Sequence, residues 1–279
     1  MIRLSHFDDR EGIIALWQEA FGDSREAVEM FLNNRYLPQN TLVAEENGKI
    51  ASMLFLLDGE VKAYDKLLKA YYLYAAATLK EFRGKGIMAQ MLREAEKLAQ
   101  SGGVDLICLK PAEESLYRFY EKHGYKTVFS IKTVTLIADY SSVTDVSGIC
   151  PNIFAARETA FAGLDRFIWS KEAIDYAINQ HKFYGGKVFD NREGYCLYST
   201  DGNICFVKEF CFTSQNASKV LTQIAAAEQI KEFRIELPVD YAINYNNSFV
   251  SANGMALLIS KNSQFLENKS CLYLSLTLD

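Results

Sequence analysis

The residues best suited to chemistry lie in one short turn, Arg83-Gly84-Lys85-Gly86, which follows an apolar run and precedes a helical pattern. A strand that enters a helix through such a turn leaves several backbone N–H groups unpaired at the positive end of the helix dipole. Glycine lets an anion approach the backbone closely, and the Arg and Lys side chains add positive charge. The turn is therefore predicted to bind a pyrophosphate.

Two common nucleotide-binding motifs do not fit this turn. A Walker loop needs Ser or Thr after its Gly-Lys pair to hold Mg²⁺, whereas Gly86 follows Lys85 here. A dinucleotide fingerprint needs an acidic residue at the end of a second strand about twenty residues on, where this chain has Gly102-Gly103. A solvated helix start with two basic residues is the simplest interpretation without a ligand.

The downstream sequence narrows the choice. Residues 104–109 are typical of a short buried strand, and a helix is expected over residues 113–122, ending at Gly124. Two segments resemble the signatures of the GCN5-related N-acetyltransferase (GNAT) family: Arg83-Gly84-Lys85-Gly86-Ile87-Met88 and Phe119-Tyr120-Glu121-Lys122-His123-Gly124-Tyr125. The family's loop ends in Gly or Ala, so Met88 departs from it, although Met88 still supplies its backbone N–H.

The resemblance implies a GNAT fold, an α/β (α+β) architecture with a mixed, largely antiparallel central sheet flanked by helices. It also implies acetyl-coenzyme A (acetyl-CoA) as co-substrate and no metal. Contacts to acetyl-CoA are expected from Ala77, Thr78, Leu79, Arg83, Gly84, Lys85, Gly86, Ile87 and Met88. A backbone N–H near Ala77 is expected to polarise the thioester oxygen.

Acyl transfer to an amine also requires a proton for the departing thiolate and a base for the attacking nitrogen. Tyr120 stands at the position of the family's general-acid tyrosine, and a phenol with an ordinary pKa near ~10 is a suitable donor to a thiolate. Tyr117 is the fallback acid, and simple packing is the alternative for both side chains. The base stays open among Glu113, Glu114, the carboxylate of Asp279 and a water relay.

The first half supplies the elements that would hold these residues. Asp8 or Asp9 is expected to cap a helix that runs to Phe21, and Ser24 to cap a second helix. Asn47-Gly48 is a strong hairpin signal, and an apolar strand over residues 67–79 leads into the Gly-rich turn. This order is the one that the GNAT resemblance implies.

The second half of the chain resembles a degenerate repeat of the first half. A hairpin is expected over residues 195–212, then a helix over 214–228 and a strand over 233–237, and the turn Thr213-Ser214-Gln215-Asn216 lacks glycines and basic residues. We predict a catalytic GNAT domain over residues 1–142 that binds acetyl-CoA, and a degenerate GNAT-like domain over residues 150–279 without a pyrophosphate loop. An unrelated α/β cap is the alternative. The arrangement resembles the enhanced-intracellular-survival (Eis) type of acetyltransferase, without its sterol-carrier-like domain.

Composition adds exclusions rather than a function. The formal net charge of −5 disfavours a nucleic-acid binder and is compatible with an amine-bearing acceptor. No apolar run reaches the ~20 residues of a membrane span, and the N-terminus lacks a signal-peptide pattern. The 6 cysteines include no C-x-x-C pair, so we interpret them as buried thiols of a cytoplasmic protein rather than as metal ligands or disulfides.

These features predict a cytoplasmic N-acetyltransferase that moves an acetyl group from acetyl-CoA to a primary amine by direct attack in a ternary complex. The acceptor is a small-molecule or peptide amine, and a homo-oligomer is compatible with the sequence. A tandem-GNAT aminoacyl transferase is a second class, but that class lacks an intact pyrophosphate loop. A non-catalytic acetyl-CoA-binding module is a third, and only Tyr120 argues against it.

Overall fold

The computed structural model describes residues 1–138, 152–212, 214–241, 247–274 and 276, without the side chains of residues 214 and 215. Backbone contacts divide the chain into two units. The first comprises Met1–Val128 and Gly254–Lys269, and the second comprises Phe129–Asn253 and Ser270–Thr277. The chain thus leaves the first unit after Val128 and returns to it at Gly254, which differs from a single boundary between residues 142 and 150.

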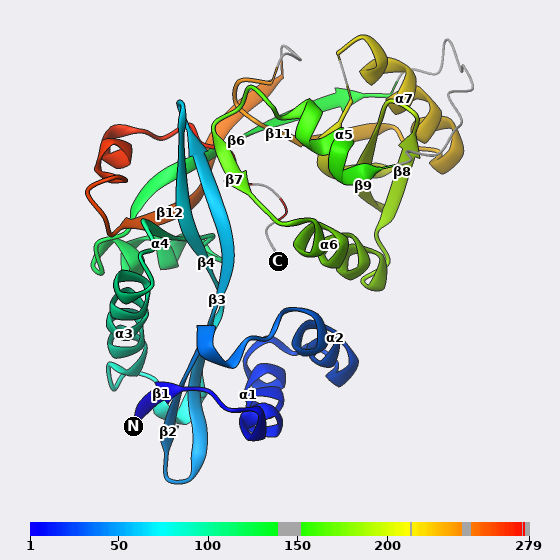
Figure 1. Ribbon diagram of the computed structural model, residues 1–279. Helices are drawn as coiled ribbons and strands as arrows, with labels where there is room; N and C mark the ends of the chain where they lie inside the picture. Colours follow the sequence, from blue (N-terminus) through cyan, green and yellow to red (C-terminus); the bar gives the residue numbers. More distant parts are fainter. Residues whose placement is uncertain (139–151, 213, 242–246, 275, 277–279) are drawn as a thin grey trace. The chain divides into compact units, whose positions relative to one another are not determined.

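The first unit is a sheet with helices on both faces (Figure 1). In order across the sheet its strands are β1 (Ile2–Leu4), β2 (Thr41–Glu46), β3 (Lys49–Ala63), β4 (Lys66–Thr78), β5 (Leu106–Leu109) and the second half of β12 (Ser248–Leu258). Strands β1 to β4 pair antiparallel, β5 runs parallel to β4, and β12 runs antiparallel to β5. This is the mixed, largely antiparallel sheet expected.

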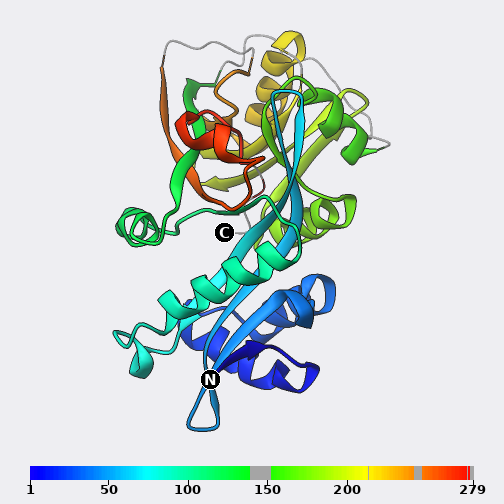
Figure 2. The ribbon, with the colours of Figure 1, turned by 60° about the vertical axis from the view of Figure 1, so that its left-hand side comes forward.

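Helices α1 (Arg10–Phe21) and α2 (Arg25–Arg35) lie on one side of these strands and α3 (Ile87–Ser101) on the other (Figure 1). Figure 2 shows α3 lying along the strands that it covers. Helix α4 (Glu114–Glu121) follows β5. Single 3₁₀ turns complete the unit: η1 (Phe7–Asp9), η2 (Pro38–Asn40), η3 (Lys80–Phe82) and η4 (Gln264–Asn268).

Local signals in the sequence account for most of these boundaries. Ser24 Oγ accepts the Ala27 N–H at 3.2 Å, so the predicted cap of α2 is confirmed. Asn47 and Gly48 both have positive φ, 53° and 74°, as a tight hairpin turn requires. Asp9 precedes α1, but its carboxylate accepts the His6 N–H at 2.7 Å and does not cap α1.

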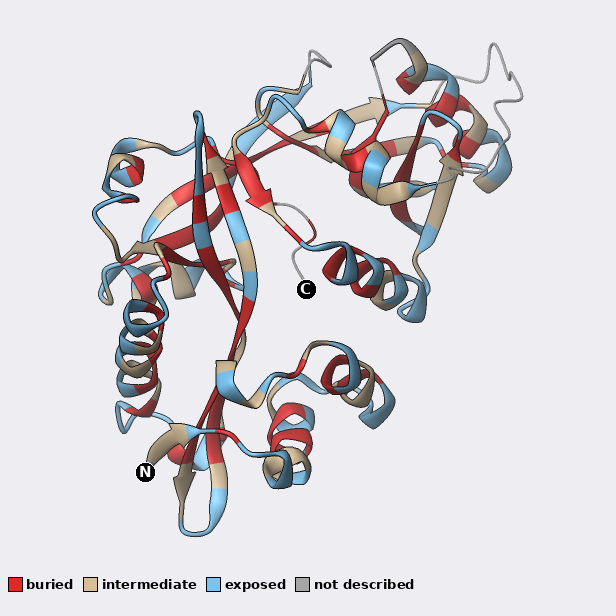
Figure 3. Cartoon of the chain, viewed as in Figure 1, coloured by how far each residue is buried: buried red, intermediate tan, exposed pale blue. Residues whose placement is uncertain are grey.

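The core of the first unit is built on the inner face of α1. The ring of Trp17 lies 5.0 Å from that of Phe31 on α2 and 5.6 Å from that of Phe55 on β3, measured between ring centroids. Figure 3 shows the buried residues of α1 gathered on one face of the helix. The spacing of apolar residues in the sequence predicts this face because positions three and four apart share one side of a helix.

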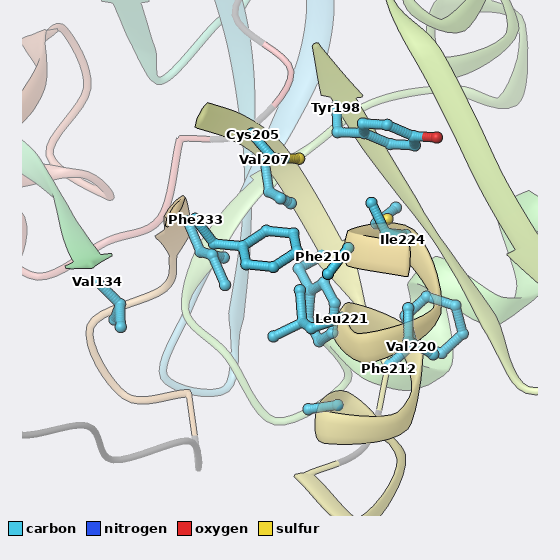
Figure 4. Close-up of a cluster of buried hydrophobic side chains, with 14 of the residues drawn as sticks. Val134, Tyr198, Cys205, Val207, Phe210, Phe212, Val220, Leu221, Ile224 and Phe233 are labelled. Atoms are coloured by element: carbon cyan, nitrogen blue, oxygen red, sulfur yellow. The ribbon is translucent and has the colours of Figure 1, made fainter. Parts of the chain in front are cut away.

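The second unit has a sheet with the strand order β6 (Lys126–Ile137), β11 (Glu232–Leu237), β10 (Ile204–Cys211), β9 (Gly194–Asp201) and β8 (Lys187–Asn191). Its other elements are α5 (Ile153–Ala160), β7 (Arg166–Ile168), α6 (Lys171–Phe183) and α7 (Ser214–Glu228). Figure 4 shows the side chains of α7 packed against those of β9, β10 and β11, with Ile224, Phe210 and Phe233 each about 1% exposed. The predicted hairpin, helix and strand are confirmed.

The two units share an order of elements and pairings. In the first, the β3–β4 hairpin leads through α3 to β5, which is parallel to β4. In the second, the β9–β10 hairpin leads through α7 to β11, which is parallel to β10. An antiparallel strand completes each sheet: β12 pairs with β5, and β6 pairs with β11. β12, which completes the first sheet, is thus reached directly from the second unit along the chain. β6, which completes the second sheet, directly follows the first unit along the chain.

The interpretation of the cysteines is confirmed in part. Cys108, Cys196, Cys205 and Cys211 are free and buried, but Cys271 is free and exposed. Cys150 lies outside the described residues. No helix within the described ranges is long and apolar enough to cross a membrane.

Candidate active site

Strand β4 is irregular near its C-terminal end. Where β3 has only Leu54, β4 has two residues, Ala75 and Ala76, so the ladder contains a bulge. Ala75 has a φ of 47°, a left-handed conformation that costs a residue other than glycine about 1–2 kcal/mol. A bulge bends a strand and re-aims its backbone groups, and strain of this kind concentrates at functional sites.

Beyond this point β4 has a strand on one side only. It pairs with β5 at Ala70–Tyr72, whereas residues 73–78 pair within the described chain with β3 alone. The Leu79 N–H donates to the Ala51 carbonyl at 2.9 Å, so the alternation of an antiparallel ladder directs the Thr78 N–H to the open side. The edge can therefore pair with the amides of an extended ligand.

The predicted pyrophosphate turn follows directly. Gly84 and Gly86 have φ values of 77° and 75°, and Gly86 is the N-cap of α3. The first bond of the helix runs from the Gln90 N–H to the Gly86 carbonyl, and the N–H groups of residues 84–88 donate to no acceptor within the described chain. A Cβ built on either glycine would meet no atom within 4 Å. Conformation explains the glycines, and the space beside the backbone is open.

The two basic side chains of the turn are exposed. Arg83 Nε donates to the Thr78 carbonyl at 2.9 Å, which ties the turn to the end of β4. Lys85 Nζ lies 4.8 Å from the centroid of the Phe82 ring. Both positively charged groups therefore remain close to the turn, where they can attract an anion.

The remaining predicted contacts lie on the same stretch of backbone. Ala77 and Leu79 bury their side chains, at 7% and 8% exposed, and the Ala77 carbonyl and the Leu79 N–H already bond to residues of β3, so the Thr78 N–H is left to meet a ligand. Thr78 is half-buried, and its Oγ1 lies 2.9 Å from Ser52 Oγ. The fold thus brings every predicted cofactor residue from position 77 to position 88 into one continuous segment.

Tyr120 occupies the last turn of α4. It is 8% exposed, and its ring meets that of Tyr125 edge to face at 5.4 Å between centroids. Burial raises the pKa of Tyr120 to about 12. Its hydroxyl has no hydrogen-bond partner in the described part of the chain, unlike a packing tyrosine that donates to a backbone carbonyl. Tyr117 is half-buried, and burial raises its pKa too.

The candidate bases are less informative. Glu113 and Glu114 are exposed at the start of α4, where acidic residues suit the helix dipole, and Glu113 accepts from Ser115 Oγ. Asp279 lies outside the described residues. The His123 N–H donates to the Tyr120 carbonyl at 2.9 Å, so His123 lies in the turn after α4.

The bulge at Ala75 is the feature that sequence reasoning missed. Three consecutive alanines give no local signal for it, because a bulge is set by the register against β3. The positive φ could not be predicted from alanine, which rarely adopts it.

A strand edge that leads into a Gly-rich turn, with a phenol on a later helix, is the arrangement that the GNAT resemblance implies. Residues 1–128 match the family model described as acetyltransferase (GNAT) domain. The resemblance to the GNAT family that the sequence predicts is therefore confirmed for residues 1–128.

Solved structures extend the likeness to both units. The chain is similar to a GCN5-related N-acetyltransferase from Anabaena variabilis (TM-score 0.74, 14% identity), a probable N-acyltransferase from Enterococcus faecalis (0.71, 16%) and Eis1 from Mycobacterium abscessus (0.66, 12%). Each match covers 93% of this chain and, in the same order, 73%, 72% and 74% of the other chain. At these identities the likeness shows the fold, and it confirms the expected two-unit GNAT architecture. The comparison with curated proteins gives no match.

Proposed function

We propose that this protein is an N-acetyltransferase that moves the acetyl group of acetyl-CoA to a primary amine by direct attack in a ternary complex. The observation that carries the proposal is the continuity between the open edge of β4 and the unpaired N–H groups of residues 84–88. An edge with free amide groups, followed by an anion site, matches a ligand that joins a chain of amides to a pyrophosphate.

In this proposal the segment Ala77–Leu79 pairs with the amide chain, and the turn binds the pyrophosphate. The N–H groups of Gly84 to Met88 supply the donors, and Arg83 and Lys85 supply the charge. The bulge beside Ala77 aims a backbone N–H at the thioester oxygen, where negative charge develops as the amine attacks.

Tyr120 acts as the general acid. Because its pKa is raised by burial, it stays protonated at neutral pH and can give its proton to the departing thiolate. The base is Glu113, Glu114, Asp279 or a water relay, and the acceptor is a small-molecule or peptide amine.

We also propose that the second unit is a degenerate GNAT-like domain that binds no cofactor. β10 keeps a bulge at Lys208, three residues before its end, as β4 does at Ala75. However, Tyr241, which follows β11, donates its hydroxyl to the Phe212 carbonyl just beyond β10. This bond bridges the ends of the two parallel strands, where the first unit leaves its edge open.

Calorimetric titration with coenzyme A tests the site. We expect Arg83→Ala to weaken binding about ten- to a hundredfold, because a charge-assisted contact contributes roughly 1.5–3 kcal/mol. Arg25→Ala is the matched control: it removes an exposed arginine on α2 that pairs with Glu11 and Glu29, and should leave the affinity unchanged. Equal affinity of wild type and Arg83→Ala for coenzyme A would contradict the proposed pyrophosphate site. Binding of acetyl-CoA without transfer to any amine would favour a non-catalytic module.

A further inference from the structure

The Tyr125 hydroxyl is a buried polar group with no hydrogen-bond partner among the residues that the structure describes. The side chain is 2% exposed, and it follows Gly124, the turn residue that ends the α4 segment. Burying a hydroxyl without a partner costs about 1–3 kcal/mol relative to a satisfied one. A phenylalanine would fill the same space without that cost, so packing alone does not explain the hydroxyl.

The ring of Tyr125 lies against the ring of the proposed general acid. Its ring meets the Tyr120 ring edge to face at 5.4 Å between centroids. Burial raises its pKa well above the ordinary value, with smaller contributions from Tyr120, Cys108 on β5 and Glu96 on α3. Cys108 pairs with Tyr72, at the last point where β5 and β4 are joined. Tyr125 is therefore near the point where the two strands diverge, and Tyr120 contacts its ring.

Once Tyr120 has given up its proton, its phenolate needs a hydrogen-bond donor. When a buried phenol gives up its proton, it becomes an anion in a poorly solvated place, which is costly unless a donor reaches it. Burial raises the pKa of Tyr120 and so favours the neutral form of the phenol. Tyr125, whose ring contacts that of Tyr120, carries a buried hydroxyl that has no acceptor within the described residues.

We propose that Tyr125 is a positioning residue for the acid: its hydroxyl donates a hydrogen bond to the Tyr120 oxygen once that oxygen has given up its proton. This inference rests on the proposed function.

The proton balance is as follows. The amine nitrogen bonds to the acyl carbon, the carbon–sulfur bond breaks, and its electron pair goes to sulfur. The Tyr120 proton moves to that sulfur, the nitrogen loses a proton to water, and water returns one to Tyr120. Tyr125 keeps its own proton throughout.

The first test needs no acceptor. In the full chain labelled with [¹³Cζ]tyrosine, the Tyr120 signal is assigned by its absence in Tyr120→Phe, and its ionisation is followed with rising pH. We expect ionisation to begin about one to two pH units later in Tyr125→Phe than in wild type, because the donor to the phenolate is gone. Identical titrations in the two proteins overturn the proposal. If they differ but no amine is acetylated, the proposed function fails while the pairing of the phenols stands.

The second test compares stability with turnover. Tyr125→Phe removes a hydroxyl without a partner, so we expect an unchanged or higher Tm together with a kcat lowered about ten- to a hundredfold. Tyr36→Phe is the matched control, because the Tyr36 hydroxyl donates to the His6 carbonyl at 2.8 Å and its loss should lower Tm while sparing kcat. In a Tyr120→Phe background, Tyr125→Phe should cost nothing further. A fall in Tm with normal kcat, or an equal kcat loss in both backgrounds, overturns the proposal.

Discussion

The hydroxyl of Tyr120, like that of Tyr125, has no partner among the described residues, whereas several other buried tyrosines use theirs in the fold. Tyr36 and Tyr195 donate to a carbonyl and a carboxylate, at 2.8 and 2.9 Å. A phenol that is held by packing but left free at its oxygen can meet a ligand without first breaking a protein contact. At the residue scale, this freedom separates Tyr120 from tyrosines such as Tyr36 and Tyr195, whose hydroxyls already hold the fold.

Replacing Tyr120 by Phe keeps the ring and deletes only the hydroxyl. We expect kcat to fall about 10²–10⁴-fold with little change in coenzyme A affinity, whereas Tyr117→Phe should stay near wild type. Because the pKa of Tyr120 is about 12, its ionisation should not lower the wild-type rate between pH 7 and 10. Any decline from this phenol should come only as the pH approaches 12, and Tyr120→Phe should lack it. Steady-state kinetics that show Tyr120→Phe with most of the wild-type kcat would remove Tyr120 from the mechanism.

At the scale of elements, Asp105 ties the returning segment to the first sheet. It immediately precedes β5, and its carboxylate accepts the Lys69 N–H at 2.9 Å and the Ser260 hydroxyl at 2.5 Å. Its carbonyl accepts from Ser263 Oγ at 2.8 Å. These bonds join β4, β5 and the chain after β12, so Asp105 helps to close the sheet that carries the candidate active site.

Asp105→Ala should therefore destabilise the first unit by about 1–3 kcal/mol, because partly buried donors lose their acceptor. Hydrogen exchange should rise mainly over residues 255–263 and at Lys69. Asp58→Ala is the control: this exposed aspartate on β3 accepts from Asn40 at 3.3 Å, and its loss should change stability by less than about 0.5 kcal/mol. Equal effects of both variants in urea unfolding would contradict the role of Asp105.

At the scale of the whole molecule, the question is whether both units bind the cofactor or only the first unit does. The second unit is organised around a buried ion pair: Glu209, which follows the bulge of β10, accepts from Arg157 Nε and from the Tyr195 hydroxyl, each at 2.9 Å. Glu209 and Arg157 are both 0% exposed. Because these buried groups bind one another, we expect them to stabilise the second unit rather than to bind a ligand.

Glu209→Ala leaves Arg157 buried without its main partner and should cost about 3–5 kcal/mol of stability. Below the unfolding transition, coenzyme A should still bind with wild-type affinity and with one molecule per chain, because the proposed site belongs to the first unit. Glu232→Ala, which removes a partly exposed partner of Arg234, should be nearly neutral. Calorimetry that shows two bound molecules in wild type, or lost affinity in folded Glu209→Ala, would refute this division.

Local chemistry in the sequence by itself determined the Gly-rich turn, the Ser24 cap, the hairpins and the order of elements in both units. Glycines at positive φ, a serine cap and alternating apolar residues act over a few positions, so they can be read without knowing the fold. The alignment of Tyr120 with a family motif likewise needed only the sequence.

Only the tertiary structure decided which strand completes which sheet, since alternation marks a strand but does not name its partner. β12 pairs with β5 and β6 with β11 through contacts far apart in the chain. The bulge at Ala75 depends on the register against β3, and the lack of a partner for Tyr125 depends on what surrounds its hydroxyl. These are long-range properties of packing, and no local pattern in the sequence encodes them.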